Sequence, residues 1–268
     1  MKSYFDSKRK LLVCYRAHST PDFWDSHWNV AERNEIDIVG TKDTHVSRVT
    51  KKYLTPEEGI ILDGGCGTGE HVAALVNNGY RCIGIDFAEK TVRAIQQRFP
   101  ALDIRYGDVQ ALPFEDDFFA GYWSVGVIEH SWEGYGSILS EMARVLRREG
   151  YLFLSFPYMS PLRKMKSRFN AYESFRDENP DGFYQFILDA NSVLEDLRTY
   201  GFDIIDARPW DGLKGTKDEI NAVKPFLQSL YDYRGENAFI KRWKGAVDNL
   251  LSSIAAHNIL LILKKNSS

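Results

Sequence analysis

Three glycines at alternating positions, between an apolar run and a helix-like pattern, constrain this chain more than any other feature. The run Ile60-Ile61-Leu62 is typical of a buried strand and leads directly into Asp63-Gly64-Gly65-Cys66-Gly67-Thr68-Gly69. Apolar residues then recur at helical spacing up to Gly79. Because glycine permits positive φ and close backbone approach, and a helix N-terminus presents unpaired N–H groups, we expect a ligand at this turn. A plain tight turn is the alternative.

The turn does not match the dinucleotide fingerprint G-x-G-x-x-G. Counted from Gly65, the last position is Glu70, and counted from Gly67 it is Val72. This argues against a nucleotide-dependent oxidoreductase, which remains one alternative function.

Strand and helix patterns alternate along the middle of the chain. Predicted strands lie at 60–62, 82–85, 102–106, 118–125 and 151–156, with a helix–strand pair at 191–209 and a last strand at 257–263. The alternation predicts an α/β fold with a mostly parallel, doubly wound sheet of seven strands covered by helices on both faces.

An aspartate follows each of the first three predicted strands, at Asp63, Asp86 and Asp108. In such sheets ligands bind outside the carboxyl ends of the strands, so the three acids should share one crevice. Asp86 is placed to bind the hydroxyls of a ribose, and Phe87 to stack on a purine. Asp108, next to Val109, is placed to accept a hydrogen bond from an exocyclic amine.

Five segments in this order resemble motifs of the class I S-adenosylmethionine-dependent methyltransferases. The nearest branch is the small-molecule one of ubiquinone and menaquinone biosynthesis (methyltransferase type 11). Gly64 departs from the pattern, since an apolar residue is commoner there. The segments are 61–69, 84–88, 107–114, 124–130 and 141–150.

The resemblance implies a Rossmann-like fold with an antiparallel last strand, S-adenosylmethionine as methyl donor, S-adenosylhomocysteine as product, and no metal. It implies that the glycine turn lies under the methionine part of the cofactor and that Val125 and Gly126 lie at the sulfonium. The implied cofactor-binding residues are Asp63, Gly64, Gly65, Gly67, Gly69, Asp86, Phe87, Asp108, Val109, Val125 and Gly126.

Methyl transfer is an in-line displacement, so the protein mainly aligns the reactants and needs a base only for a protonated acceptor. His130 is the first candidate base and Glu129 a weaker one. A purely structural role for His130, as a cap or packing residue, is equally open.

We expect one methyltransferase domain over 1–268. It would comprise an N-terminal helical lid segment (1–58), the cofactor-binding core (59–156), and two helical or aromatic inserts on the acceptor side (157–190 and 210–254). Aromatic residues, 13% of the chain, gather in these flanking parts. They suit a lid or an apolar acceptor pocket, or simply local cores. The lid would carry Tyr15, Phe23, Trp24 and Trp28, and the first insert Tyr158, Phe169, Tyr172, Phe175, Phe183, Tyr184 and Phe186.

A basic cluster at 163–168 either meets an anionic acceptor or is a solvated face. The net charge of −3, with no basic stripe, argues against a nucleic-acid substrate. Three cysteines without zinc spacing, and no apolar run long enough for a signal peptide or a membrane span, predict a cytoplasmic protein. The expected partner is a small-molecule acceptor, which the sequence does not identify. A homodimer and a non-catalytic scaffold that kept the fold both stay open.

Overall fold

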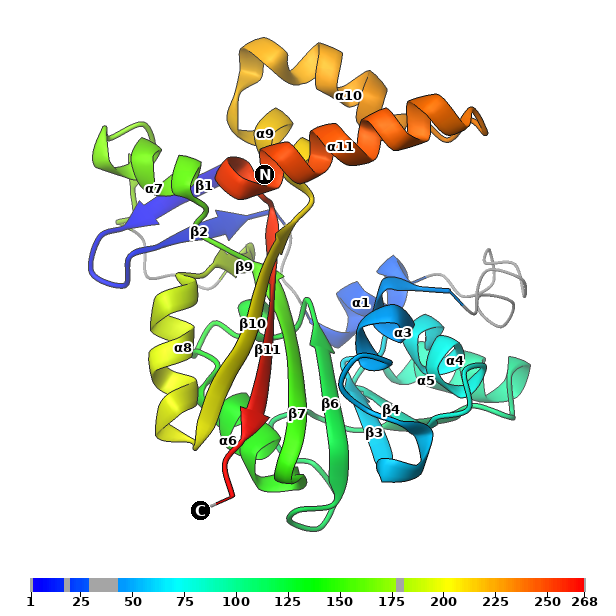
Figure 1. Cartoon of the computed structure of the whole chain (residues 1–268). Helices are drawn as coiled ribbons and strands as arrows, with labels where there is room; N and C mark the ends of the chain where they lie inside the picture. The colour runs from blue at the N-terminus through cyan, green and yellow to red at the C-terminus, as the bar shows by residue number, and fades with distance from the viewer. Residues whose placement is uncertain (1, 17–19, 29–42, 177–180, 268) are drawn as a thin grey trace.

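A seven-stranded sheet forms the centre of the molecule (Figure 1). The computed structural model describes residues 2–16, 20–28, 43–176 and 181–267. The strands lie in the order β10-β11-β7-β6-β3-β4-β5, and β11 runs antiparallel to both of its neighbours while the other pairs are parallel. All seven strands expected from the sequence are present, and so is the antiparallel last strand. Their bounds are β3 Ile60–Gly64, β4 Arg81–Asp86, β5 Asp103–Tyr106, β6 Phe119–Val125, β7 Leu146–Pro157, β10 Phe202–Trp210 and β11 Asn258–Lys265.

Helices cover both faces of this sheet, as the alternation predicted. One face carries α3 (His45–Thr50), α4 (Glu70–Val76) and α5 (Glu89–Arg98), and the other α6 (Gly136–Val145) and α8 (Ala190–Thr199). A strand points alternate side chains to opposite faces, and β11 shows this directly. Ile259, Leu261 and Leu263 enter the core under α6 and α8, while Leu260 and Ile262 enter the core under α3 to α5.

A second sheet of four strands, in the order β8-β1-β2-β9, was not expected from the sequence. The N-terminal segment was expected to be helical, but it begins with the hairpin of β1 (Lys2–Asp6) and β2 (Leu11–Tyr15). The continuous apolar run Leu11-Leu12-Val13-Cys14 is fully buried, as in an inner strand. The other two strands come from the 157–190 insert: β8 (Glu173–Ser174) and β9 (Phe183–Ile187).

Part of the N-terminal segment is helical as expected: α1 spans Pro21–His27, and Thr20 caps its first turn. Residues 1, 17–19 and 29–42 of this segment, and 177–180 of the first insert, lie outside the described residues. Two short 3-10 helices, η2 (Pro56–Glu58) and η3 (Ile128–His130), precede β3 and follow β6. The second of these carries both candidate bases.

The basic cluster at 163–168 lies on α7 (Pro161–Arg168), and most of its side chains form ion pairs within the protein. Arg163 is buried and pairs with Glu219 at 2.8 Å, and Lys166 pairs with the same carboxylate at 2.6 Å. These bonds tie α7 to α9 (Gly212–Glu219). Arg163 and Lys166 therefore hold the second insert in place and form neither a solvated face nor an acceptor contact.

The second insert folds as α9, η4 (Asn221–Val223), α10 (Lys224–Asp232) and α11 (Ala238–Ala255), which extend beyond the sheet (Figure 1). Its docking needs a glycine, since a Cβ on Gly215 would overlap the carbonyl oxygen of Ala255. Gly245 lies in α11, and a Cβ there would meet nothing within 4 Å.

These two glycines give a matched stability test. Gly215→Ala should lower the free energy of unfolding by about 1–3 kcal/mol, because backbone atoms must move apart. Gly245→Ala should raise it by about 0.5–1 kcal/mol, because alanine loses less conformational entropy in a helix. Urea unfolding followed by tryptophan fluorescence measures both, and equal effects of the two changes would contradict this docking.

Candidate functional site

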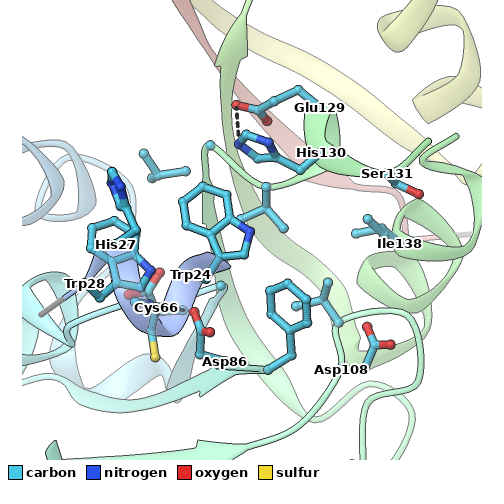
Figure 2. Close-up of a pocket in the computed structure, with 18 of the residues that line it drawn as sticks. Trp24, His27, Trp28, Cys66, Asp86, Asp108, Glu129, His130, Ser131 and Ile138 are labelled. Carbon is cyan, nitrogen blue, oxygen red and sulfur yellow. Dashed lines mark hydrogen bonds and ion pairs between the residues drawn. The ribbon is translucent and has the colours of Figure 1, made fainter. Parts of the chain in front are cut away.

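A cavity of about 570 Å³ opens at the carboxyl ends of the central strands. It is lined by residues that follow β3, β4, β5 and β6, and by residues of α1 and β9 (Figure 2). Of the eleven residues expected to bind a cofactor, nine line this cavity: Asp63, Gly65, Gly67, Asp86, Phe87, Asp108, Val109, Val125 and Gly126. The residues that were expected to share one crevice therefore lie together in space.

The two exceptions, Gly64 and Gly69, do not line the cavity. Gly64 ends β3 against the ring of Tyr122, where a Cβ would overlap the phenol. Gly69 is the N-cap residue of α4, and a Cβ on it would overlap the end of Ile104. A side chain at either position would therefore clash with another part of the protein, so these glycines serve packing and not ligand contact.

The glycine turn is fixed by the strand beside it. The backbone N–H groups of Gly65 and Cys66 donate to the carbonyl of Ile85 at 2.8 and 3.0 Å. Asp86 accepts hydrogen bonds from the N–H of Gly67 at 2.8 Å and of Ala88 at 2.9 Å. Gly67 has φ +51, and the ring of Trp28 lies 3.0 Å from where its Cβ would stand.

Burial shifts the pKa values of the acids at this end of the sheet. It raises the pKa of the Asp63 carboxyl to about 6, an effect that nearby His71 opposes. Burial also raises the pKa of Asp86, although its backbone hydrogen bonds act in the other direction. Asp108 stays more exposed and accepts the N–H of Gln110 at 2.9 Å.

An aromatic wall closes one side of the cavity. Trp24 from α1 lies edge-on to His130 at 4.9 Å between ring centroids, and Tyr184 from β9 lies 5.1 Å from the same imidazole. Trp28 stacks on Trp24 at 5.8 Å. The expected lid aromatics Trp24 and Trp28 thus face the cavity, and so does Tyr184 of the first insert.

A carboxylate attaches this wall to the core. Asp25 of α1 accepts hydrogen bonds from the backbone N–H of Thr91 at 2.8 Å and from its hydroxyl at 3.0 Å. Thr91 is in the first turn of α5, and the N-cap residue of that helix, Ala88, has no side chain able to cap it. Asp25 therefore supplies the missing cap from 66 residues away.

The candidate bases lie side by side on η3 (Figure 2). His130 has Nδ1 2.6 Å from the carbonyl oxygen of Tyr184, so this nitrogen carries the hydrogen and Nε2 has the lone pair. Glu129 Oε1 lies 3.9 Å from that Nε2, and Oε2 has no hydrogen-bond partner among the described residues. Burial lowers the pKa of His130 to about 4 and raises the pKa of Glu129 to about 8.

Several lining residues were missed from the sequence. Gln185 and Ser131 carried no motif, and Gln185 lies on β9, which pairs with β2 in the second sheet. The other aromatics of the first insert do not line the cavity: Phe183 and Phe186 pack against Trp132, and Tyr172 donates to Glu219. Among the described residues, no cluster of three or more metal-ligating side chains occurs, and none of their helices is long and apolar enough to cross a membrane.

Glu129→Gln should change the pH dependence of stability. The folded protein keeps the Glu129 proton up to about pH 8, whereas the unfolded chain releases it near the ordinary pKa of 4.5. The wild type should therefore lose stability relative to the Gln variant as pH rises from 5 to 8, by a few kcal/mol. Urea unfolding across this range measures the difference, and a constant difference would contradict a buried, protonated Glu129.

Comparison with known proteins agrees with this geometry. Residues 62–154 match a family model described as a methyltransferase domain. The chain is 32% identical over 146 residues to a probable S-adenosylmethionine-dependent methyltransferase of Mycolicibacterium smegmatis, covering 54% of this chain and 52% of that protein. It is 26% identical over 130 residues to a demethylmenaquinone methyltransferase of Lysinibacillus sphaericus, covering 46% and 55%.

A solved structure described as the [4+2]-cyclase SpnF superposes with a TM-score of 0.58 at 17% identity, covering 96% of this chain and 98% of that one. That likeness shows the fold alone. The chain spans about half the length of the curated relatives it matches first. With the strand order, the glycine turn and the family match together, residues 62–154 are a class I S-adenosylmethionine-dependent methyltransferase domain.

Proposed function

We propose that this protein binds S-adenosylmethionine in the 570 Å³ cavity and catalyses methyl transfer to a small-molecule acceptor. The observation that carries the proposal is the convergence of the motif residues from four strand ends on one cavity. The residues fit the cofactor: Gly65 and Gly67 line the cavity, and the buried carboxylate of Asp86 stands beside them. The expected homodimer stays a prediction.

The resemblance assigns each wall of the cavity a part of the cofactor. Asp63 and the turn from Gly65 to Gly69 would hold the methionine part, and Asp86 the ribose hydroxyls. Phe87, Asp108 and Val109 would frame the adenine, while Val125 and Gly126 would face the sulfonium. When bound, S-adenosylmethionine supplies a methyl group on a positively charged sulfur. The protein residues have to exclude water and align the acceptor.

His130 is held ready to accept a proton from the acceptor. Its Nδ1–H is donated to Tyr184 O, which fixes the ring and leaves the Nε2 lone pair. With its pKa lowered to about 4, the imidazole is neutral at physiological pH. A neutral imidazole is the form that acts as a general base.

Asp86→Asn tests the cofactor site. Loss of the charged acceptor should weaken binding of S-adenosylhomocysteine at least tenfold, since hydrogen bonds to charged groups contribute about 1.5–3 kcal/mol. Isothermal titration calorimetry measures this. Asp103→Asn removes an exposed acid on β5, paired with Arg105, and should leave the affinity unchanged. Binding of NADH by the wild type, without binding of S-adenosylhomocysteine, would support an oxidoreductase instead.

His130→Gln tests the base. Turnover of an acceptor found by screening small molecules with methyl-labelled cofactor should fall about 10²–10⁴-fold, with S-adenosylhomocysteine affinity retained. His45→Gln, at a histidine beside Trp210, serves as the matched control and should keep both. Retained binding with unchanged turnover in His130→Gln would remove His130 as base. Retained binding with no acceptor turned over by the wild type would favour a scaffold that lost the chemistry.

A further inference from the structure

The charge of the cavity restricts what can be methylated there. The described lining residues include five carboxyl side chains but no lysine or arginine; the carboxyls are Asp63, Glu70, Asp86, Asp108 and Glu129. Arg16, close enough to influence the pKa of Tyr184, is not part of the described lining. A carboxylate or phosphate on the acceptor would therefore find no lysine or arginine of this lining to pair with. This favours an acceptor that is neutral or positively charged.

One of these carboxyls lacks a partner where the reaction must occur. Glu129 is only 1% exposed, and its Oε2 accepts no hydrogen bond from any described residue. Its Oε1 lies 3.6 Å from where a Cβ on Gly126 would stand, beside the end of β6. Buried polar atoms are nearly always satisfied in folded proteins, so an orphaned oxygen in a cavity wall indicates a missing donor.

The neighbouring imidazole presents a second acceptor atom. Since Nδ1 of His130 donates to Tyr184 O, its Nε2 has a lone pair and no hydrogen, and it lies 3.9 Å from Glu129 Oε1. A protonated amine paired with Glu129 lies next to this nitrogen, and it compensates the charge of a buried carboxylate, which a neutral hydroxyl does not.

The aromatic wall adds attraction for positive charge. The rings of Trp24 and Tyr184 lie 6.5 Å apart, and each lies close to His130 (Figure 2 shows Trp24 and His130). Aromatic faces attract cations, most strongly when water is excluded. Two rings beside a buried carboxyl are therefore suited to an ammonium group.

We propose that the acceptor is a small amine, and that Glu129 selects it by pairing with its ammonium group. This inference rests on the proposed function and deepens it. The nearby positive charge favours the ionised form of Glu129, which burial alone disfavours. Nε2 of His130, the base of the proposed function, then takes a proton from the ammonium, so an N–H bond of the ammonium breaks and an N–H bond of the imidazole forms.

The transfer balances without a further reactant. The freed nitrogen lone pair forms a bond to the methyl carbon while the carbon–sulfur bond breaks and its electrons return to sulfur. The methylated nitrogen gains the positive charge that sulfur loses. The products are a methylated ammonium, a neutral thioether and a protonated His130, which returns its proton to solvent.

Binding of three matched probes to the protein saturated with S-adenosylhomocysteine tests this inference. The probes are phenethylamine, 2-phenylethanol and phenylacetate, titrated calorimetrically near pH 7.5. The wild type should bind phenethylamine at least tenfold more tightly than phenylacetate. Glu129→Gln should reduce that preference to within about threefold while S-adenosylhomocysteine affinity is kept, which also shows that the variant is folded.

Glu70→Gln is the matched control, because it removes a different carboxyl from the same lining. It should keep the preference for the amine, which separates a specific role of Glu129 from the general charge of the cavity. Absence of phenethylamine binding, equal binding of phenylacetate, or an undiminished preference in Glu129→Gln would overturn the amine acceptor. Failure of S-adenosylhomocysteine itself to bind would instead overturn the proposed function.

Discussion

The hydrogen bonds of one buried carboxylate, that of Asp86, hold the site together. Through the N–H of Gly67 it fixes the glycine turn, and through the N–H of Ala88 it fixes the chain that enters α5. One turn further along α5, Asp25 caps Thr91 and so attaches the aromatic wall to the same point. Turn, strand end and wall thus depend on the first residues of a single helix. Movement of α5 would disturb all three together.

The sequence was sufficient to predict the central sheet because inner strands such as β3, β4 and β6 contain short apolar runs next to glycine or aspartate. The positions of the glycine turn and Asp86 could also be predicted, because the carboxyl ends of neighbouring parallel strands lie at the same edge of the sheet. It was insufficient for the second sheet. Pairing of β2 with β9 joins residues such as Val13 and Phe186, which lie far apart in the chain. No local pattern reveals such a pairing.

The pKa values of the candidate bases could not be predicted from the sequence either. Glu129 and His130 are adjacent residues, but burial raises the pKa of the first and lowers that of the second. That burial depends on side chains from α1, in the N-terminal segment, and from β9, in the first insert. These two elements lie far apart in the sequence. The overall fold does not determine the reaction either, since a protein described as a [4+2]-cyclase shares it. The chemistry has to be inferred from the side chains around the cavity.

A crystal structure with S-adenosylhomocysteine tests the central claim most directly, because it shows both the cofactor position and the space left for an acceptor. The account predicts the ribose on Asp86, the glycine turn under the amino-acid part, and the sulfur beside Gly126, with Glu129 and Trp24 lining the space next to it. A ligand bound elsewhere, or a sulfur turned away from Glu129 and His130, would contradict it.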